Sequence, residues 1–254
     1  MSQRKGVSRP ADVPDDILHQ LNSGTLETMT LAEGLAVNFA VLLRNIAPEV
    51  PDKAAQQITA SDGITKRMTR AAQLLLEYVG PQSLDRFATH PSDTVRGWAA
   101  YMLAQLPDLA LGARLESIRP LANDHHFGVR EWAWLALRPH IANDIEDTIR
   151  LLTPWVTDTS PNIRRFAVES TRPRGVWCSH IPHLKRQPEL GLPLLEPVKA
   201  DASRYVQDSV SNWLNDAAKS QPQWVQMLCA RWQSESDTPA TTRICTRALR
   251  SIKS

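Results

Sequence analysis

The sequence predicts an all-α protein built from stacked helix pairs, and a repeating pattern is the main reason. A β-branched residue recurs within an apolar stretch at Val95, Val129, Ile163 and Val206, with spacings of 34, 34 and 43 residues. Three of these four units carry an aspartate five residues earlier, at Asp124, Asp158 and Asp201. No stretch alternates apolar and polar residues as a strand would. One helix pair of this kind cannot bury its own apolar face, so we expect the pairs to stack into one continuous core.

Proline usage agrees with many short helices. The chain has 18 prolines and only 10 glycines, and proline ends a helix or occupies its first turn. The prolines cluster near the expected ends of the units, at Pro107, Pro120, Pro139, Pro154, Pro161, Pro173 and Pro222.

In chain order, we expect a polar tail over residues 1–14 and one repeat domain over 15–254, with the clearest repeats between 90 and 220. Ahead of the repeats, helices should cover residues 15–22, 26–46, 51–59, 63–79 and 81–89. A last helix pair should cover about 222–253. The third spacing is nine residues longer than the other two, and the extra residues fall at about 177–192. An insertion in one repeat often marks the binding face.

Charge distribution is more informative than the net charge of +2. Six basic residues and one acid lie between 162 and 187, and no acid follows Asp237, although Arg243, Arg247 and Arg250 do. Two local basic stretches are typical of a surface that binds a phosphate backbone, with solvated helix faces as the alternative. The N-terminus has no apolar segment, and no run is long enough to span a bilayer. We therefore expect a cytoplasmic protein without a membrane partner.

The stretch from Glu169 to Arg174 and the stretch from Asn212 to Lys219 carry the candidate chemistry. Each holds a carboxylate next to basic side chains at the end of a repeat unit. Such an arrangement predicts an anionic pocket inside a basic groove. This pocket suits a cationic group that is attached to a polyanion, such as a positively charged, alkylated base in DNA.

A resemblance to a known family rests on these motifs. The segments that resemble it are Ala136–Pro139, Arg164–Ala167, Glu169–Arg174, Trp177 and Ser209–Lys219. They are similar to the AlkC/AlkD superfamily of HEAT-like-repeat DNA glycosylases, and most similar to its AlkC branch. The resemblance implies a right-handed α-solenoid of HEAT-like repeats with a concave basic groove. It also implies a monomer that removes positively charged N-alkylated bases, such as 3-methyladenine, from double-stranded DNA without a metal or cofactor.

Site residues are carried over by motif. Glu169, Trp177 and Asp216 fall where AlkC-type enzymes place catalytic-pocket residues, and Arg172 and Arg174 fall where they place DNA-backbone contacts. The sequence adds further candidates for backbone binding, which are Arg164, Lys219, Arg243, Arg247 and Arg250.

One position departs from the AlkC pattern. Trp134 stands where that branch usually carries a glutamate, and Glu131 lies about one helical turn earlier. Two alternatives follow, since either Glu131 substitutes as a catalytic acid or Trp134 contacts the lesion through its ring.

The chemistry can be argued without the family. Alkylation at N3 or N7 makes the base a cation and a good leaving group. The transition state has oxocarbenium character at the sugar, so a nearby carboxylate stabilises it and can orient the attacking water. Two alternatives stay open at this stage. Glu169 and Asp216 could be surface acids paired with Arg172 and Lys219, and the repeat array could bind DNA or a protein without catalysis.

Overall fold

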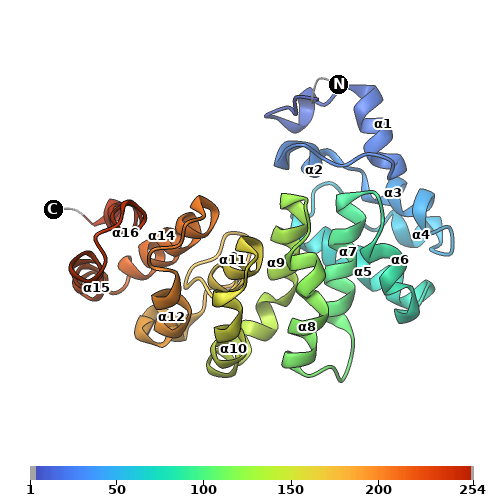
Figure 1. Cartoon of the computed structure of the whole chain (residues 1–254). Coiled ribbons are helices and arrows are strands. Elements are labelled where there is room, and N and C mark those ends of the chain that lie inside the picture. The colour runs from blue at the N-terminus through green and yellow to red at the C-terminus, as the bar shows by residue number, and fades with distance from the viewer. Residues whose placement is uncertain (1–3, 253–254) are drawn as a thin grey trace. The chain divides into compact units, whose positions relative to one another are not determined.

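The computed structural model describes residues 4–252, and within them the chain is helical without strands (Figure 1). Contacts divide the chain into two compact units, Met1–Ala136 and Leu137–Ser254, with the boundary inside helix α9 (Phe127–Asn143). None of the described helices has the length and apolar character that crossing a bilayer requires.

The first unit opens with short helices and continues with longer ones. Their bounds are α1 (Asp15–Ser23), α2 (Leu31–Ala36), α3 (Phe39–Ile46), α4 (Asp52–Ala55), α5 (Ile64–Tyr78), α6 (Leu84–Ala88), α7 (Asp93–Gln105), α8 (Leu111–Ala122) and the first part of α9. The helix expected over 26–46 is two helices. The Asn38 side chain accepts a hydrogen bond from the Val41 N–H at 3.2 Å and so starts α3 afresh, as a good N-cap residue does.

The expected polar tail contacts the first unit from residue 4 onwards. Arg4 donates two hydrogen bonds, of 2.7 and 2.8 Å, to the two carboxylate oxygens of Glu33, whose side chain is fully buried. Val13 is also buried. A buried carboxylate needs a partner of opposite charge, so Arg4 anchors this segment on α2.

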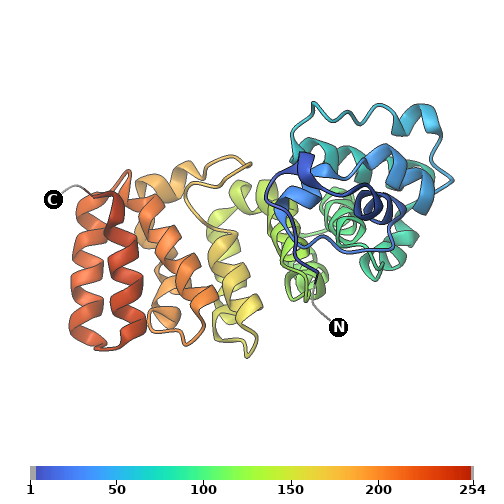
Figure 2. The same ribbon diagram turned by 90° about the horizontal axis from the view of Figure 1, so that it is seen from above.

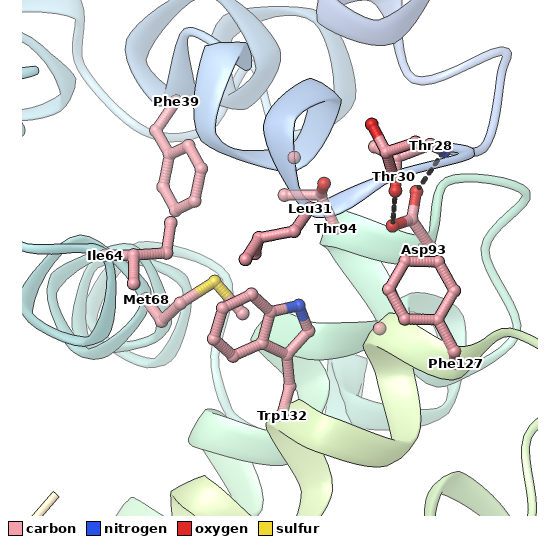
Figure 3. Close-up of a pocket in the computed structure, with 12 residues that line it drawn as sticks. Thr28, Thr30, Leu31, Phe39, Ile64, Met68, Asp93, Thr94, Phe127 and Trp132 are labelled. Atoms are coloured by element: carbon pink, nitrogen blue, oxygen red, sulfur yellow. Dashed lines mark hydrogen bonds between the residues drawn. The ribbon is translucent and has the colours of Figure 1, made fainter. Parts of the chain in front are cut away.

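Aromatic packing forms the core of the first unit (Figure 3). Trp98 is buried and meets Phe39 edge-on at 5.2 Å between ring centroids. Gly97 lets Trp132 approach, because a Cβ at Gly97 would lie 2.6 Å from the Trp132 ring and 2.7 Å from the Met68 methyl. Figure 3 shows Trp132 and Met68 among the residues that line a pocket. The volume of this pocket is only about 20 Å³. Trp98 and Trp132 therefore pack in the core.

The second unit contains the remaining helices. Their bounds are the end of α9, α10 (Ile145–Leu152), α11 (Pro161–Glu169), α12 (Pro182–Arg186), α13 (Leu192–Leu195), α14 (Arg204–Ala218), α15 (Pro222–Glu235) and α16 (Pro239–Ala248). Helix α14 packs against α11 on one side and α16 on the other. Helices α15 and α16, drawn in red, lie side by side in Figure 2. The extra residues of the third spacing fall in the loop after α11 and in α12, which follows it.

Two prolines differ from their expected positions. Pro120 and Pro139 lie inside α8 and α9, near the C-terminal ends of these helices. Proline late in a helix breaks one backbone hydrogen bond there, but it does not end the helix when tertiary packing supports the turn.

A side-chain contact recurs at the same position of each repeat, one residue after the β-branched residue. Arg96 donates from Nη1 to the carbonyls of His90 and Pro91, six and five residues earlier, at 2.8 and 3.1 Å. The next two repeats do the same through Arg130, at 2.7 and 2.9 Å, and Arg164, at 2.8 and 3.0 Å. In the fourth unit the amide of Gln207 donates to the Asp201 carbonyl at 2.7 Å.

Two of these arginines also pair with the repeating aspartate of the following repeat. Arg96 binds Asp124 through Nε and Nη2 at 2.8 and 3.0 Å, and Arg164 binds Asp201 in the same way at 2.6 and 2.9 Å. Each aspartate also accepts a hydrogen bond from the backbone N–H two residues on, at 2.7 Å for Asp124 and 2.8 Å for Asp201. We call these arginines and aspartates the ladder. It joins consecutive repeats and shapes the turn that starts each second helix.

The role expected for Arg164 is therefore wrong. Both sides of its guanidinium are committed to Asp201 and to the carbonyls of Asp158 and Thr159, so it does not present a fork to DNA. The sequence placed it in a basic stretch, and charge alone does not show which arginines have an internal partner.

Removing a ladder arginine should destabilise the second unit. Arg164→Met keeps much of the apolar stem but leaves the buried carboxylate of Asp201 unpaired, so we expect the free energy of unfolding to fall by about 3 kcal/mol. Urea denaturation measures this. Arg247→Met is the control, because Arg247 pairs with Asp208 at an exposed site, and its loss should cost less than about 1 kcal/mol. Equal costs for the two variants would contradict a stabilising ladder.

Candidate active site

Two carboxylates from neighbouring helices come together in the second unit. Glu169 is the last residue of α11 and is 4% exposed, and Asp216 lies near the end of α14 and is 3% exposed. The acids pair with Arg172 and Lys219, which the sequence had left open, but neither acid is on the surface. The two predicted catalytic acids of this unit therefore form one buried site.

Arg172 bridges the two acids. Its Nη1 donates to Glu169 Oε1 at 2.7 Å, while its Nε and Nη2 lie 2.9 and 2.7 Å from Asp216 Oδ2. Its guanidinium is therefore turned inward to the carboxylates in the DNA-free protein, and the expected contact with a phosphate of the DNA backbone stays a prediction. A guanidinium fork suits this task better than an ammonium group, because it reaches two acceptors in a fixed geometry.

Three further side chains complete the cluster. Ser209 donates to Glu169 Oε2 at 2.6 Å, and Lys219 donates to Asp216 Oδ1 at 3.2 Å. Arg165 stacks on the ring of Tyr205, with its guanidinium carbon 4.4 Å from the centroid, and its Nη2 lies 3.7 Å from Glu169 Oε2. Tyr205, Ser209 and Asp216 follow one another along one face of α14, as helical spacing requires.

The electrostatics of this cluster differ from the expected anionic pocket. Burial raises the pKa of Glu169, but the charges of Arg165 and Arg172 and the hydrogen bonds from Ser209 and Arg172 outweigh it, so the pKa lies below its ordinary value. Burial lowers the pKa of Arg172, but Glu169 and Asp216 raise it to above its ordinary value. Two carboxylates face three cations, Arg165, Arg172 and Lys219, so the cluster is positive by one charge.

The loop between α11 and α12 borders this cluster and carries Trp177. Trp177 is 47% exposed and has a positive φ of 62°, a conformation that is rare for a bulky residue and often marks a functional segment. The ring therefore reaches solvent, and its expected contact with a lesion stays a prediction. Arg174 of the same loop donates from Nη2 to Ser220 Oγ at 2.8 Å, and its buried Nε has no partner among the described atoms.

Sequence reasoning missed Arg138, although it lies inside one of the motifs that carried the resemblance. Its side chain is almost completely buried, and it donates to the carbonyls of Ser170, Arg172 and Ser179. The Ala-Leu-Arg-Pro motif could have pointed to this arginine, but the sequence does not show which carbonyls it binds.

Trp134 and Glu131 belong to the first unit, where α9 carries them. Trp134 is only 5% exposed, and its indole N–H donates to Glu131 Oε2 at 2.8 Å. A buried ring cannot stack on a base, so the expected lesion contact by Trp134 is wrong in this structure. Glu131 is half-buried.

The C-terminal arginines lie along α14. Arg243 and Arg247 bind Asp208 Oδ1 at 2.7 and 3.2 Å, and Arg250 donates to Asn212 Oδ1 at 2.9 Å. Arg247 and Arg250 are exposed. Among residues 4–252, no three His, Cys, Asp or Glu side chains gather closely enough to hold a metal ion.

Glu169 should make the free energy of unfolding depend on pH in the acidic range. Because its pKa is lowered in the folded state, its contribution is complete above the unfolded pKa of about 4.5 and is lost as pH falls through the folded value. Urea denaturation between about pH 7 and pH 3 should therefore show a gap between the protein and Glu169→Gln that narrows on acidification. Glu189→Gln, a change at an exposed acid, should follow the parental pH dependence. A constant gap for Glu169→Gln would contradict an ionised Glu169.

Comparisons with known proteins agree with this architecture. Residues 80–172 match a family model of HEAT repeats. The protein YhaZ of Bacillus subtilis (strain 168) is 35% identical over 137 residues, which cover 54% of this chain and 37% of YhaZ. The chain thus spans less than half the length of that relative.

Two solved structures are similar to this one. The alkylpurine DNA glycosylase AlkC of Pseudomonas fluorescens, bound to DNA containing an abasic site analogue, superposes with a TM-score of 0.67 at 27% identity. That match covers 84% of this chain and 60% of the AlkC chain. AlkD2 from Streptococcus mutans has a TM-score of 0.57 at 20% identity over 85% of this chain and 95% of its own, a likeness of fold. Residues 80–172 therefore carry HEAT repeats, and the chain resembles the AlkC/AlkD superfamily in sequence and in fold, as its motifs predicted.

Proposed function

We propose that this protein is a DNA glycosylase that releases positively charged N-alkylated bases, such as 3-methyladenine, from double-stranded DNA by hydrolysing the N-glycosidic bond. The observation that carries the proposal is the pair of buried carboxylates, Glu169 and Asp216, which Arg172 bridges from the loop that also carries the exposed ring of Trp177. The fold similarity to AlkC, which was solved with DNA containing an abasic site analogue, supports it.

The carboxylates suit the chemistry of this reaction. Once the base is a cation, departure needs little help from a general acid, and the barrier lies in the positive charge that develops at the sugar. An ionised carboxylate stabilises that charge and can orient water. Arg165 and Arg172 favour the ionised form of Glu169, so the acid is ready at neutral pH.

The positive excess of the cluster suits the DNA backbone. Arg165, Arg172 and Lys219 surround the acids, and a phosphate beside the lesion would share their charge. We propose that such a phosphate weakens the hold of Arg172 and Lys219 on the carboxylates, which leaves more of their negative charge to face the sugar. Trp177 would then contact the alkylated base through a cation–π interaction of about 0.5–2 kcal/mol.

Trp134 stands where the AlkC branch usually carries a glutamate. Of Glu131 and Trp134, Glu131 is the better candidate to take over the role of that glutamate. Its carboxylate is half-buried and accepts one hydrogen bond from the indole of Trp134, which fixes its direction. We propose that Glu131 is a further catalytic acid and that Trp134 holds it in place.

A non-catalytic array that binds DNA is the second candidate. The observation in its favour is that the side chains of Arg172 and Lys219 already neutralise both acids. The two functions differ in one measurement, the release of methylated base from duplex DNA.

Substitution of the acids should slow base release. Glu169→Gln and Asp216→Asn remove the negative charge without changing shape, so each should lower the single-turnover rate on methylated duplex by about 100-fold or more. Affinity for undamaged duplex should stay the same or rise slightly. The control is Asp208→Asn, which neutralises an acid two turns earlier on α14, where it binds Arg243 and Arg247.

The outcomes separate the alternatives. If both Glu169→Gln and Asp216→Asn release base at the parental rate, the assignment of these acids as catalytic residues is contradicted. A parental protein that binds DNA tightly but releases no methylated base would contradict the enzyme and favour the binding array.

Cations on the rim should contribute to DNA affinity in a salt-dependent way. Arg174→Ala and Lys219→Ala should each weaken binding to damaged and undamaged duplex by similar factors, and each should reduce the salt slope of log K by about one unit. Duplex affinity over a salt series measures this, with Arg247→Ala and Arg250→Ala giving smaller changes. Arg164→Met is the matched control, since its charge is committed to the ladder. If Arg174→Ala and Arg164→Met show the same salt slope of log K, the assignment of Arg174 to the DNA-binding surface is contradicted.

A further inference from the structure

Arg138 is a buried charge without a carboxylate partner. It is 2% exposed, and its guanidinium donates to backbone carbonyls. Burial lowers its pKa. An unpaired buried charge is costly, so the contacts that it makes need an explanation.

Those contacts all fall on one loop. Nη1 donates to the Ser170 carbonyl at 2.6 Å, and Nη2 donates to the carbonyls of Arg172 and Ser179 at 2.6 and 3.2 Å. Nε is 3.3 Å from the Ser179 carbonyl. One side chain thus ties the start of the loop to a point nine residues further on.

The loop itself has the features of a preset conformation. Its neck is closed by a hydrogen bond of 3.1 Å from the Ile181 N–H to the Pro173 carbonyl. Gly175 leaves room for the Cys178 side chain, because a Cβ at this position would lie 2.0 Å from the Cys178 sulfur and would displace it. At the tip, Val176 and Trp177 are exposed, and Trp177 keeps a positive φ. A bulky residue stays in that conformation only where its surroundings hold it.

We propose that Arg138 is a positioning residue, which holds the loop at residues 170–181 so that Arg172 reaches the two carboxylates and Trp177 stays exposed at the tip of the loop. The inference rests on the proposed function for its catalytic consequence, but the loop geometry is a property of the DNA-free protein. Arg138 binds the Arg172 carbonyl, so it sets the backbone from which the bridging guanidinium extends.

The test compares Arg138→Lys with a matched variant. Lysine keeps the positive charge but cannot bind three separate carbonyls with one rigid fork. Arg114→Lys removes the same kind of contact in the first unit, where the buried Arg114 donates to the carbonyls of Leu103, Ala104 and Leu106. Melting temperature records the structural cost of each change.

Two readouts distinguish positioning from stability. In Arg138→Lys, hydrogen exchange of the amides in 170–181 should speed up at least 10-fold in the DNA-free protein, while α14 and α15 stay protected. Single-turnover base release should slow at least 10-fold with affinity for undamaged duplex unchanged, and the effect should not add to that of Trp177→Ala. Arg114→Lys should change neither readout, even if it melts earlier.

The outcomes have separate meanings. Unchanged loop exchange in Arg138→Lys overturns the proposal, as does an equal effect of Arg114→Lys on the loop. Faster loop exchange in a protein that shows no base release leaves the positioning of the loop intact and contradicts the proposed function alone.

Discussion

The ladder of arginine and aspartate is the interaction on which the rest of this structure depends. Arg96 and Arg164 each bind the carbonyls at the turn of their own repeat and the aspartate of the next repeat. These contacts set the start of each second helix and the step from one repeat to the next. The site needs that step, because Glu169 ends α11 and Asp216 lies on α14. Arg164, near the start of α11, binds Asp201, just ahead of α14, and so joins these two repeats.

Buried arginines also end helices in both units. Arg67 donates to the carbonyls of Leu35 and Val37 at the end of α2, Arg114 does so after α7, and Arg138 does so after α11. Many short helices leave many unpaired carbonyls at their C-terminal ends. A guanidinium satisfies several of them at once, and it balances the negative end of the helix dipole. This explains why so many basic residues of the chain are unavailable to a ligand.

The candidate site combines buried acids with a surplus of positive charge. Arg172 offsets the cost of burying Glu169 and Asp216, and the same contact keeps Glu169 ionised. Because Arg165 and Lys219 add further charge, the surroundings favour an anion while the acids favour a developing cation. A nucleotide that carries both a phosphate and a cationic base matches this combination.

The repeat register, several of the helices and the two candidate acids could be predicted from the sequence. Helix spacing and capping act within a few residues, so α1 and α5 lie within one residue of the expected ranges. Glu169 and Asp216 were found because each stands in a distinctive local motif. The contacts that these side chains make could be seen only in the tertiary structure. Arg164 binds Asp201, Arg172 binds both acids, Trp134 is buried, and Arg138 binds carbonyls of the loop after α11. The partner of a long side chain depends on which helices pack together, and that packing is set by contacts far apart in the chain.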